Sequence, residues 1–292
     1  MDRRPPRPGG RVARGGAGGG GLSRASLLGD AAAERVLTTS CGPLRRADAS
    51  ELRARLGALR GAFRFVKFGD SPRGVASVSP WAAACLALQE GFEPVVHVAC
   101  RGRDRVSLRA ELLGGRVLDV RHLLCLRGDD PPGGQAFREV DVLELLAMAR
   151  GVDEGWTLLA AADPGLEPTP AVLGRLRAKV AAGAALLETQ PVFDVGAFAG
   201  WLAAVRAAGI EAPVLVDVFV LSGPEEAERV ARIPGVGVPA AVRRRLREPG
   251  GGVRVAAELV GELRGLPGVI GCHLSTFRGD VELVLAVAEG LR

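Results

Sequence analysis

An apolar run in the middle of the chain ends abruptly on charged residues. The run LLCL (123–126) is followed directly by Arg127, Gly128, Asp129 and Asp130, and then by the turn PPGG (131–134). A fixed cation beside two carboxylates on a stiff turn is typical of a loop that binds a ligand or takes part in catalysis. Other apolar runs end on polar side chains in the same way, namely His97, Arg101, Asp163, Gln190 and His273.

A scaffold must bring these side chains together, and the chain alternates short apolar runs with amphipathic stretches in a regular order. We predict eight strands, at residues 35–41, 64–68, 94–100, 122–128, 157–163, 186–193, 214–220 and 269–276. The stretches between them have apolar residues at three- and four-residue spacing, and several end in glycine, as helices do. The pattern therefore indicates repeated strand–helix units.

Nearly continuous apolar strands are typical of a parallel sheet that is buried on both faces. Eight strand–helix units in about 260 residues predict an α/β protein, a (β/α)8 TIM barrel spanning residues 29–292. A doubly wound open sheet is the alternative. In a barrel the carboxyl ends of all strands surround one mouth, so the polar strand ends should converge there.

The N-terminal segment, residues 1–28, differs in composition from the rest. It combines glycine, proline and six arginines with almost no large apolar side chains, so we expect a disordered tail. Its charge alone equals the formal net charge of +5, which leaves the body neutral and argues against a nucleic-acid partner. No apolar run reaches the roughly 18 residues of a membrane span, so no membrane partner is expected.

The cysteines bear on the redox compartment. The five cysteines are Cys41, Cys85, Cys100, Cys125 and Cys272. They are scattered without a C-x-x-C pair, and four of them stand within or beside apolar runs. This usage is typical of reduced core thiols, so we expect a cytoplasmic protein without disulfides or a metal site.

Three segments at fitting spacing resemble the methylenetetrahydrofolate reductase family. They are EPVVHVACRGRD (93–104), LLCLRGDDPPGG (123–134) and RLRAKVAAGAALLETQPVFD (175–194), and the resemblance runs from about residue 30 to 290. Members of this family are flavin-containing barrels that reduce methylenetetrahydrofolate to methyltetrahydrofolate. The resemblance implies FAD, NADH or NADPH as reductant, and a folate substrate of one-carbon metabolism and methionine biosynthesis. The choice of nicotinamide and the formation of a homo-oligomer are left open.

The resemblance also implies roles for residues around the flavin. Asp129 matches an aspartate that lies beside the flavin ring and acts on both ring and folate, and Arg127 and Gly128 would contact the flavin next to it. His97 matches a histidine that lines the same site. The plainer interpretations are that Arg127 and Asp129 form a structural pair at the rim, and that His97 is a core histidine.

Two further residues match the family at the sixth strand unit. Lys179, one of only two lysines among 38 basic residues, matches a lysine that reaches the cofactor phosphate. Gln190 matches a glutamine that holds the substrate, for which an amide offers both a donor and an acceptor. Asp129 and Gln190 are thus the expected catalytic residues. An ordinary solvated lysine is the alternative for Lys179.

One departure from the family concerns the acid at the end of the first strand. The family has a glutamate there, which helps to open the five-membered ring of the folate. Here the run is VLTTSC (36–41), no carboxylate lies between Arg35 and Asp48, and Ser40 takes the approximate position. A serine is too weak an acid to replace it, and loss of a general acid costs about 10²–10⁴-fold in rate.

Other departures add or remove groups near the expected cofactor. The run KFGDSPR (67–73) lacks a flavin-phosphate threonine, Asp163 adds a negative charge, and Asp217 replaces a small residue of the seventh strand. Three hypotheses follow: a working NAD(P)H-dependent flavin reductase, an enzyme with a different small-molecule substrate, or a non-catalytic homologue that binds a folate-like ligand or a partner subunit.

Overall fold

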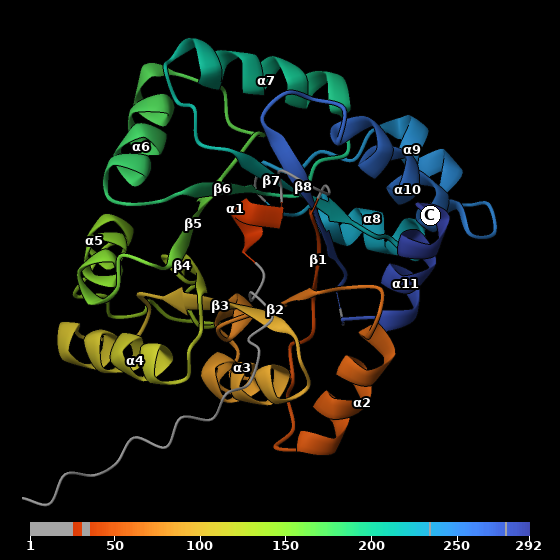
Figure 1. Cartoon of the computed structure of the whole chain (residues 1–292). Coiled ribbons are helices and arrows are strands. Elements are labelled where there is room, and N and C mark those ends of the chain that lie inside the picture. The colour runs from red at the N-terminus through yellow and green to blue at the C-terminus, as the bar shows by residue number, and fades with distance from the viewer. Residues whose placement is uncertain (1–25, 31–35, 234, 278) are drawn as a thin grey trace, which may run out of the picture.

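The computed structural model describes residues 26–30, 36–233, 235–277 and 279–292. Eight parallel strands close into a barrel in sequence order, so the predicted TIM barrel is confirmed and the open sheet is wrong (Figure 1). The strands are β1 (Val36–Ser40), β2 (Phe65–Phe68), β3 (Glu93–Ala99), β4 (His122–Leu126), β5 (Thr157–Ala162), β6 (Leu186–Thr189), β7 (Val214–Phe219) and β8 (Val269–Ser275).

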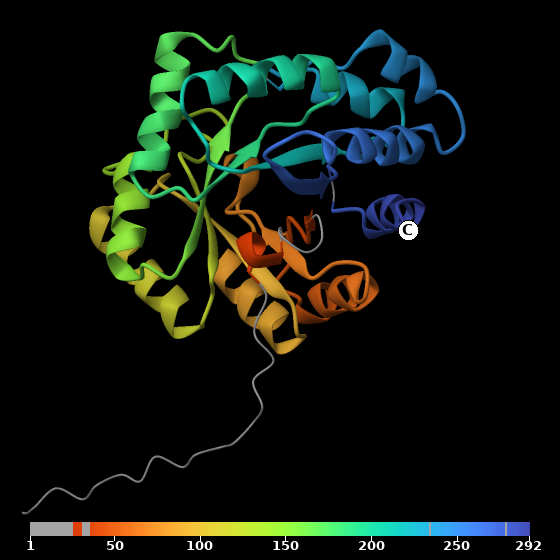
Figure 2. The same cartoon turned by 45° about the horizontal axis from the view of Figure 1, so that its top comes forward.

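Helices surround the barrel (Figure 2). They are α1 (Leu27–Asp30), α2 (Ala49–Leu59), α3 (Pro80–Gln89), α4 (Arg105–Val117), α5 (Val142–Val152), α6 (Pro170–Ala181), α7 (Val195–Ala207), α8 (Pro224–Val230), α9 (Ala240–Arg245), α10 (Gly251–Leu263) and α11 (Val281–Gly290), with a 3-10 turn at Pro72–Gly74. In the described part of the chain, none is both long and apolar enough to span a bilayer.

Most predicted strand ends agree with the structure within two residues, and β6 is the exception. It ends at Thr189 rather than at residue 193, because Pro191 has no N–H to continue the ladder. Several helices begin where an aspartate or threonine side chain accepts a backbone N–H; Asp104, Asp141, Thr169 and Asp194 all do so.

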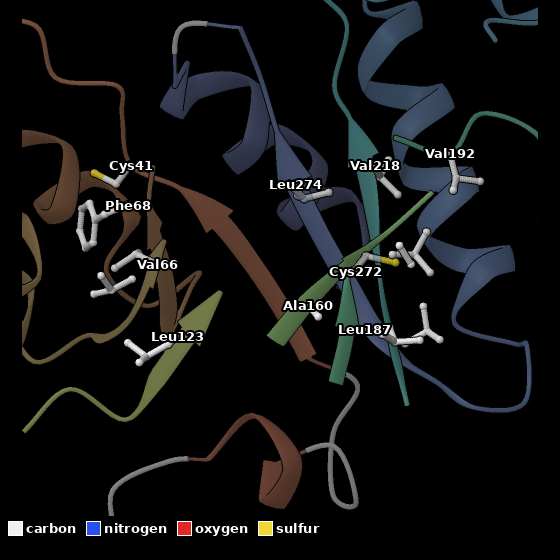
Figure 3. Close-up of a cluster of buried hydrophobic side chains, with 14 of the residues drawn as sticks. Cys41, Val66, Phe68, Leu123, Ala160, Leu187, Val192, Val218, Cys272 and Leu274 are labelled. Carbon is white, nitrogen blue, oxygen red and sulfur yellow. The ribbon is translucent and has the colours of Figure 1, made fainter. Parts of the chain in front are cut away.

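Both faces of the barrel sheet are buried, and each face packs against a different set of residues. Side chains such as Val66, Leu123, Val218 and Leu274 point outward into the large core beneath the helices (Figure 3). The alternate side chains point into the barrel, where a smaller apolar cluster fills the amino-terminal half. It comprises Val36, Phe65, Val95, Leu124, Leu159, Leu186 and Leu215. Strand alternation therefore assigns each polar residue of a strand to the interior or to the helix layer.

The short helix α1 closes the amino-terminal end of the barrel. Leu27 is fully buried in the interior cluster, and its backbone N–H donates to Nε2 of His122 at 3.3 Å. Figure 1 shows α1 in the middle of the ring of helices. The disordered tail predicted for residues 1–28 thus overlaps α1 at residues 27 and 28, where a single leucine packs although its surroundings are poor in apolar residues. Residues 1–25 lie outside the described residues.

Candidate functional site

A cavity of about 370 Å³ opens at the carboxyl ends of β2 to β6. It is lined by Gly69, Asp70, Pro72, His97, Ala99, Cys125, Leu126, Arg127, Gly128, Asp129, Val142, Ala161, Lys179 and Gln190. All six residues that the resemblance assigned to the cofactor or the substrate are in this lining. The barrel thus brings together side chains that are up to 93 positions apart in the sequence, from His97 to Gln190.

A second cavity, of about 430 Å³, adjoins the first and shares Arg127, Val142 and Lys179 with it. Its other lining residues are Cys100, Arg138, Glu139, Val140, Asp141, Leu143, Glu144 and Arg175. Arg127, Arg175 and Lys179 place three cationic side chains around the junction. The two cavities are therefore neighbours, and cationic side chains line both of them.

The loop after β4 needs a glycine and is held by an ion pair. Gly128 has φ +78°, and a Cβ on it would come within 2.8 Å of the Ala99 side chain. Arg138 donates to the Gly128 carbonyl at 2.9 Å and to Oδ1 of Asp130 at 2.6 Å. A bond from the Ala136 N–H and the Arg138 guanidinium lower the pKa of Asp130. The pair that fixes this rim is therefore Asp130 with Arg138, rather than Asp129 with Arg127.

Asp129 connects two loops of the mouth. Its Oδ2 accepts the backbone N–H of Arg73 at 2.6 Å, where Arg73 itself has φ +60°. The carboxylate thus holds the loop after β2 against the loop after β4, while it also lines the cavity. The Arg127 side chain is 66% exposed, and its guanidinium lies 3.7 Å from Asp130.

Two of the other predicted strand-end residues lie outside the cavity lining and have structural partners. Arg101 donates to the Ser71 carbonyl at 3.2 Å and to the Asp70 carbonyl at 3.1 Å, so it braces the loop after β2. Asp163 accepts the Gly165 N–H at 3.0 Å in its own turn. Neither residue lines the 370 Å³ cavity. Asp163 borders a smaller cavity of about 130 Å³ together with Lys179 and Gln190.

His97 is neutral and has an unused ring nitrogen. Burial, with a smaller contribution from the nearby Lys67 cation, lowers the pKa of His97 to about 3. Within the described part of the chain, its Nε2 makes no hydrogen bond. A buried polar atom without a partner is rare in a folded protein, and here it belongs to a cavity-lining side chain. His97 therefore offers a free hydrogen-bonding position to a ligand.

Lys179 extends from α6 to the wall of the cavity rather than into open solvent. Its Nζ donates to the carbonyl of Ala161 at 2.7 Å. Burial and the neighbouring Arg175 lower its pKa, while Asp163 acts in the opposite direction. The ammonium keeps two further N–H donors that a ligand could accept.

A second polar layer lies inside the barrel and was not expected to form a site. Lys67, whose side chain is 0% exposed, forms an ion pair with Glu188. Asp217 accepts a hydrogen bond from the Ser275 hydroxyl at 2.6 Å. The signal in the sequence was Lys67 itself, a lysine in the otherwise apolar run FVKF of an arginine-rich chain.

The first-strand hydroxyls join this layer through His273. Its Nδ1 lies 2.8 Å from Oγ1 of Thr38, and its Nε2 lies 3.1 Å from Oγ of Ser40. His273 is buried, and burial together with Lys67 and His97 lowers its pKa. It is therefore a neutral core histidine. No group of three or more histidine, cysteine or acidic side chains among the described residues is arranged to hold a metal ion.

A TIM barrel with a polar cavity at the carboxyl ends of its strands has the architecture of barrel enzymes and their ligand-binding relatives. The model of the family "Methylenetetrahydrofolate reductase" matches residues 47–282. The chain therefore belongs to the methylenetetrahydrofolate reductase family.

Curated relatives agree with this assignment. The chain is 28% identical over 151 residues to the 5,10-methylenetetrahydrofolate reductase of Salmonella typhimurium, a match covering 51% of each chain. It is 24% identical over 180 residues to a probable methylenetetrahydrofolate reductase (NADPH) of Caenorhabditis elegans, which covers 59% of this chain and 27% of the relative. The chain thus spans about half of the bacterial relative and about a quarter of the nematode one.

Solved structures share the fold. An uncharacterized protein from Clostridium thermocellum, which binds two copies of 5-methyl-5,6,7,8-tetrahydrofolic acid, superposes with a TM-score of 0.67 at 13% identity. The match covers 91% of this chain and 98% of that chain. A phosphonopyruvate hydrolase superposes with a TM-score of 0.53 at 13% identity, covering 90% of this chain and 81% of that chain. At such identities the likeness shows the barrel alone.

Proposed function

We propose that this protein is a flavin-dependent oxidoreductase that reduces methylenetetrahydrofolate at the barrel mouth. The observation that carries the proposal is the single 370 Å³ cavity, which His97, Asp129, Lys179 and Gln190 line together. These are the side chains that the family resemblance selects, and they come from a strand, two loops and a helix of a chain within that family. NADH or NADPH would serve as the reductant.

The cationic side chains that line the two cavities suit the diphosphate of FAD. The flavin ring would occupy the cavity beside Gly128 and Asp129, where the free Nε2 of His97 can form a hydrogen bond. The diphosphate would pass Lys179 and Arg175 into the second cavity, since cationic donors of this kind bind phosphate oxygens. When bound, the flavin would supply hydride transfer, which no side chain can perform.

The nicotinamide and the folate would bind at the same barrel mouth, one after the other. Gln190 lines the cavity and carries an amide that can both donate to and accept from a pterin edge. Asp129 lines the same cavity, and one of its carboxylate oxygens already holds the Arg73 N–H. This anchoring fixes the orientation of the carboxylate before a ligand arrives.

The compartment and pathway follow from the same proposal. All five cysteines are free, and four of them are buried, which suits the reducing cytoplasm. We place the activity in one-carbon metabolism, where methyltetrahydrofolate supplies methionine biosynthesis.

A non-catalytic or differently specific homologue is the second candidate. The observation in its favour is β1, where Ser40 is hydrogen-bonded to His273 and no carboxylate is present. Such a protein would bind a folate-like ligand or a partner subunit without reducing methylenetetrahydrofolate.

One set of assays on purified protein separates the two. FAD is titrated into the protein, and flavin reduction by NADH and NADPH and reduction of methylenetetrahydrofolate are then followed separately. Saturable FAD binding with turnover of both substrates supports the reductase. Binding of methyltetrahydrofolate by a protein that takes up no flavin would support the second candidate.

A further inference from the structure

The proposed reduction requires a proton at the folate. A methylene group that bridges two nitrogens can become a methyl group on one of them only if the other carbon–nitrogen bond breaks. The departing nitrogen keeps the electron pair and must be protonated. Ser40 at the end of β1 is a poor donor, because a hydroxyl is a weak acid and its oxygen is already 3.1 Å from the His273 ring.

Asp217 points into the same end of the barrel. Strand alternation puts it on the inner face with Leu215, while its neighbour Val218 lies in the outer core (Figure 3). The register of β6 and β7 pairs Glu188 with Leu215, and the Val192 N–H donates to the Asp217 carbonyl at 2.9 Å. The Asp217 N–H donates to Oγ1 of Thr189 at 2.9 Å, so Asp217 lies beside the end of β6, directly before Gln190 of the cavity wall. Asp217 is only partly buried, whereas Lys67 and Glu188 beneath it are buried.

The charges around Asp217 allow it to hold a proton near neutrality. Burial is the main cause that raises its pKa to about 7, and the carboxylate of Glu188 acts in the same direction. The hydrogen bond from Ser275 and the cation of Lys67 oppose the shift. Lys67 is already paired with Glu188, so its charge is largely compensated. His273, the β8 neighbour of Asp217, stays neutral because its own pKa is lowered.

His97 on β3 is a further titratable group at this level of the interior. It is also neutral at physiological pH, because burial lowers its pKa to about 3. Neither His97 nor His273 can therefore serve as a reservoir for the proton. The Glu188 carboxyl group is occupied by its ion pair with Lys67, so Asp217 is the carboxyl group of this interior layer that we consider as the donor.

We propose that Asp217 donates the proton that opens the methylene bridge of the folate, in place of an acid on β1. This inference rests on the proposed function. The carboxyl O–H bond breaks and its proton forms an N–H bond with the departing nitrogen, while the carbon–nitrogen bond breaks with its electrons on that nitrogen. The carbon is left doubly bonded to the other nitrogen as an iminium cation. The new Asp217 carboxylate balances that positive charge, and water returns the proton after turnover.

Asp217→Asn tests the donor in the full-length protein reconstituted with FAD. The amide keeps the size of the side chain but has no acidic proton. We expect the folate half-reaction to fall by about 10²–10⁴-fold, and the reduction of flavin by NAD(P)H to remain unchanged. Equal folate half-reactions in the variant and the wild type would overturn the inference and leave the reductase standing. A wild-type protein that reduces its flavin but no folate would overturn both the donor and the folate substrate.

Ser275→Ala supplies a readout that a purely structural role would not change. The serine stabilises the Asp217 carboxylate, so its removal should raise the pKa of Asp217. An acid must be protonated to act, so the rate falls as the pH rises through its pKa, and in Ser275→Ala this fall should occur at higher pH. Independently of turnover, the infrared carbonyl band of a protonated carboxyl should titrate near neutrality in flavin-free wild-type protein, and be absent in Asp217→Asn. A band that is identical in both proteins would refute the assignment.

Discussion

The ammonium of Lys67 on β2 is paired with the carboxylate of Glu188 on β6, inside the barrel and out of contact with solvent. Burial lowers the pKa of Lys67, and Glu188, followed by Asp217, opposes that effect. An ion pair in this position is costly to separate, because each charge alone would be left without water or counter-ion. The pair therefore fixes the spacing of two strands beneath the cavity.

Lys67→Met should strongly destabilise the protein. The change leaves the Glu188 carboxylate buried without its cation, and breaking a buried pair in this way costs about 3–5 kcal/mol. The double variant Lys67→Met/Glu188→Leu should recover much of the loss, since neither charge remains. Urea unfolding of the three proteins, followed by circular dichroism, measures both effects. Equal stability of the single and double variants would show that the pair is not coupled.

The end of the N-terminal segment gives the second prediction. Leu27→Ala should lower the free energy of unfolding by about 2–4 kcal/mol, because it empties a fully buried position at the base of the barrel. Leu28→Ala is the matched control: that side chain is 37% exposed, and its loss should cost less than about 0.5 kcal/mol. Thermal and urea unfolding distinguish the two. If both substitutions lower the free energy of unfolding by a similarly small amount, α1 does not stabilise the barrel.

Asp129 and Asp130 are neighbours with different partners, which allows a paired test of the rim. Asp129→Asn keeps an oxygen that can accept the Arg73 N–H, so the fold should survive while folate binding or reduction weakens. Asp130→Asn breaks the ion pair with Arg138, and should loosen the loop. Melting temperature and folate affinity are measured for both. An Asp129→Asn protein that unfolds like a core mutant, yet is fully active where folded, would make Asp129 structural.

The cationic side chains around the two cavities predict that one substitution weakens FAD binding selectively. Lys179→Met should weaken FAD binding by about 10-fold or more, because one charge-assisted contact to a phosphate is lost. Arg177→Met on the same helix is the control, since Arg177 donates to the Ala208 carbonyl and lines neither cavity. Quenching of flavin fluorescence gives both affinities. Equal losses in the two variants would argue against a phosphate site at Lys179.

The residues in these tests differ in whether the sequence alone could predict their position. The barrel was predictable because the apolar runs repeat, and the rim residues because each follows a run. His97 and Gln190, which were singled out in this way, both line the 370 Å³ cavity. The Lys67–Glu188 pair was not predictable, because it depends on which strand face points inward and on the distance across a closed barrel. Leu27 was missed for a similar reason, since its burial depends on a gap that only the assembled strands create.

The last prediction concerns the acid that β1 lacks. Ser40 faces the barrel interior, where it contacts His273, whereas Thr39 is buried and donates to the Leu274 carbonyl of β8. A glutamate at Ser40 would therefore enter the mouth, and one at Thr39 would be forced against the neighbouring strand. Ser40→Glu should act on the folate half-reaction alone: it should change little in the wild type, where Asp217 already donates, and gain up to roughly 10²–10⁴-fold in the Asp217→Asn protein if the geometry is close. Thr39→Glu should instead destabilise the fold.

Combining Ser40→Glu with Asp217→Asn connects this prediction to the proposed donor. If Asp217 supplies the proton in the wild type, the added glutamate should restore folate reduction to the Asp217→Asn protein, since either carboxyl can protonate the departing nitrogen. Flavin reduction by NAD(P)H, followed with menadione as acceptor, should stay constant across all four proteins, because that step needs no acid at β1. A wild-type enzyme whose folate reduction is as fast as its flavin reduction, and is unaffected by both changes, would show that neither carboxyl limits the reaction.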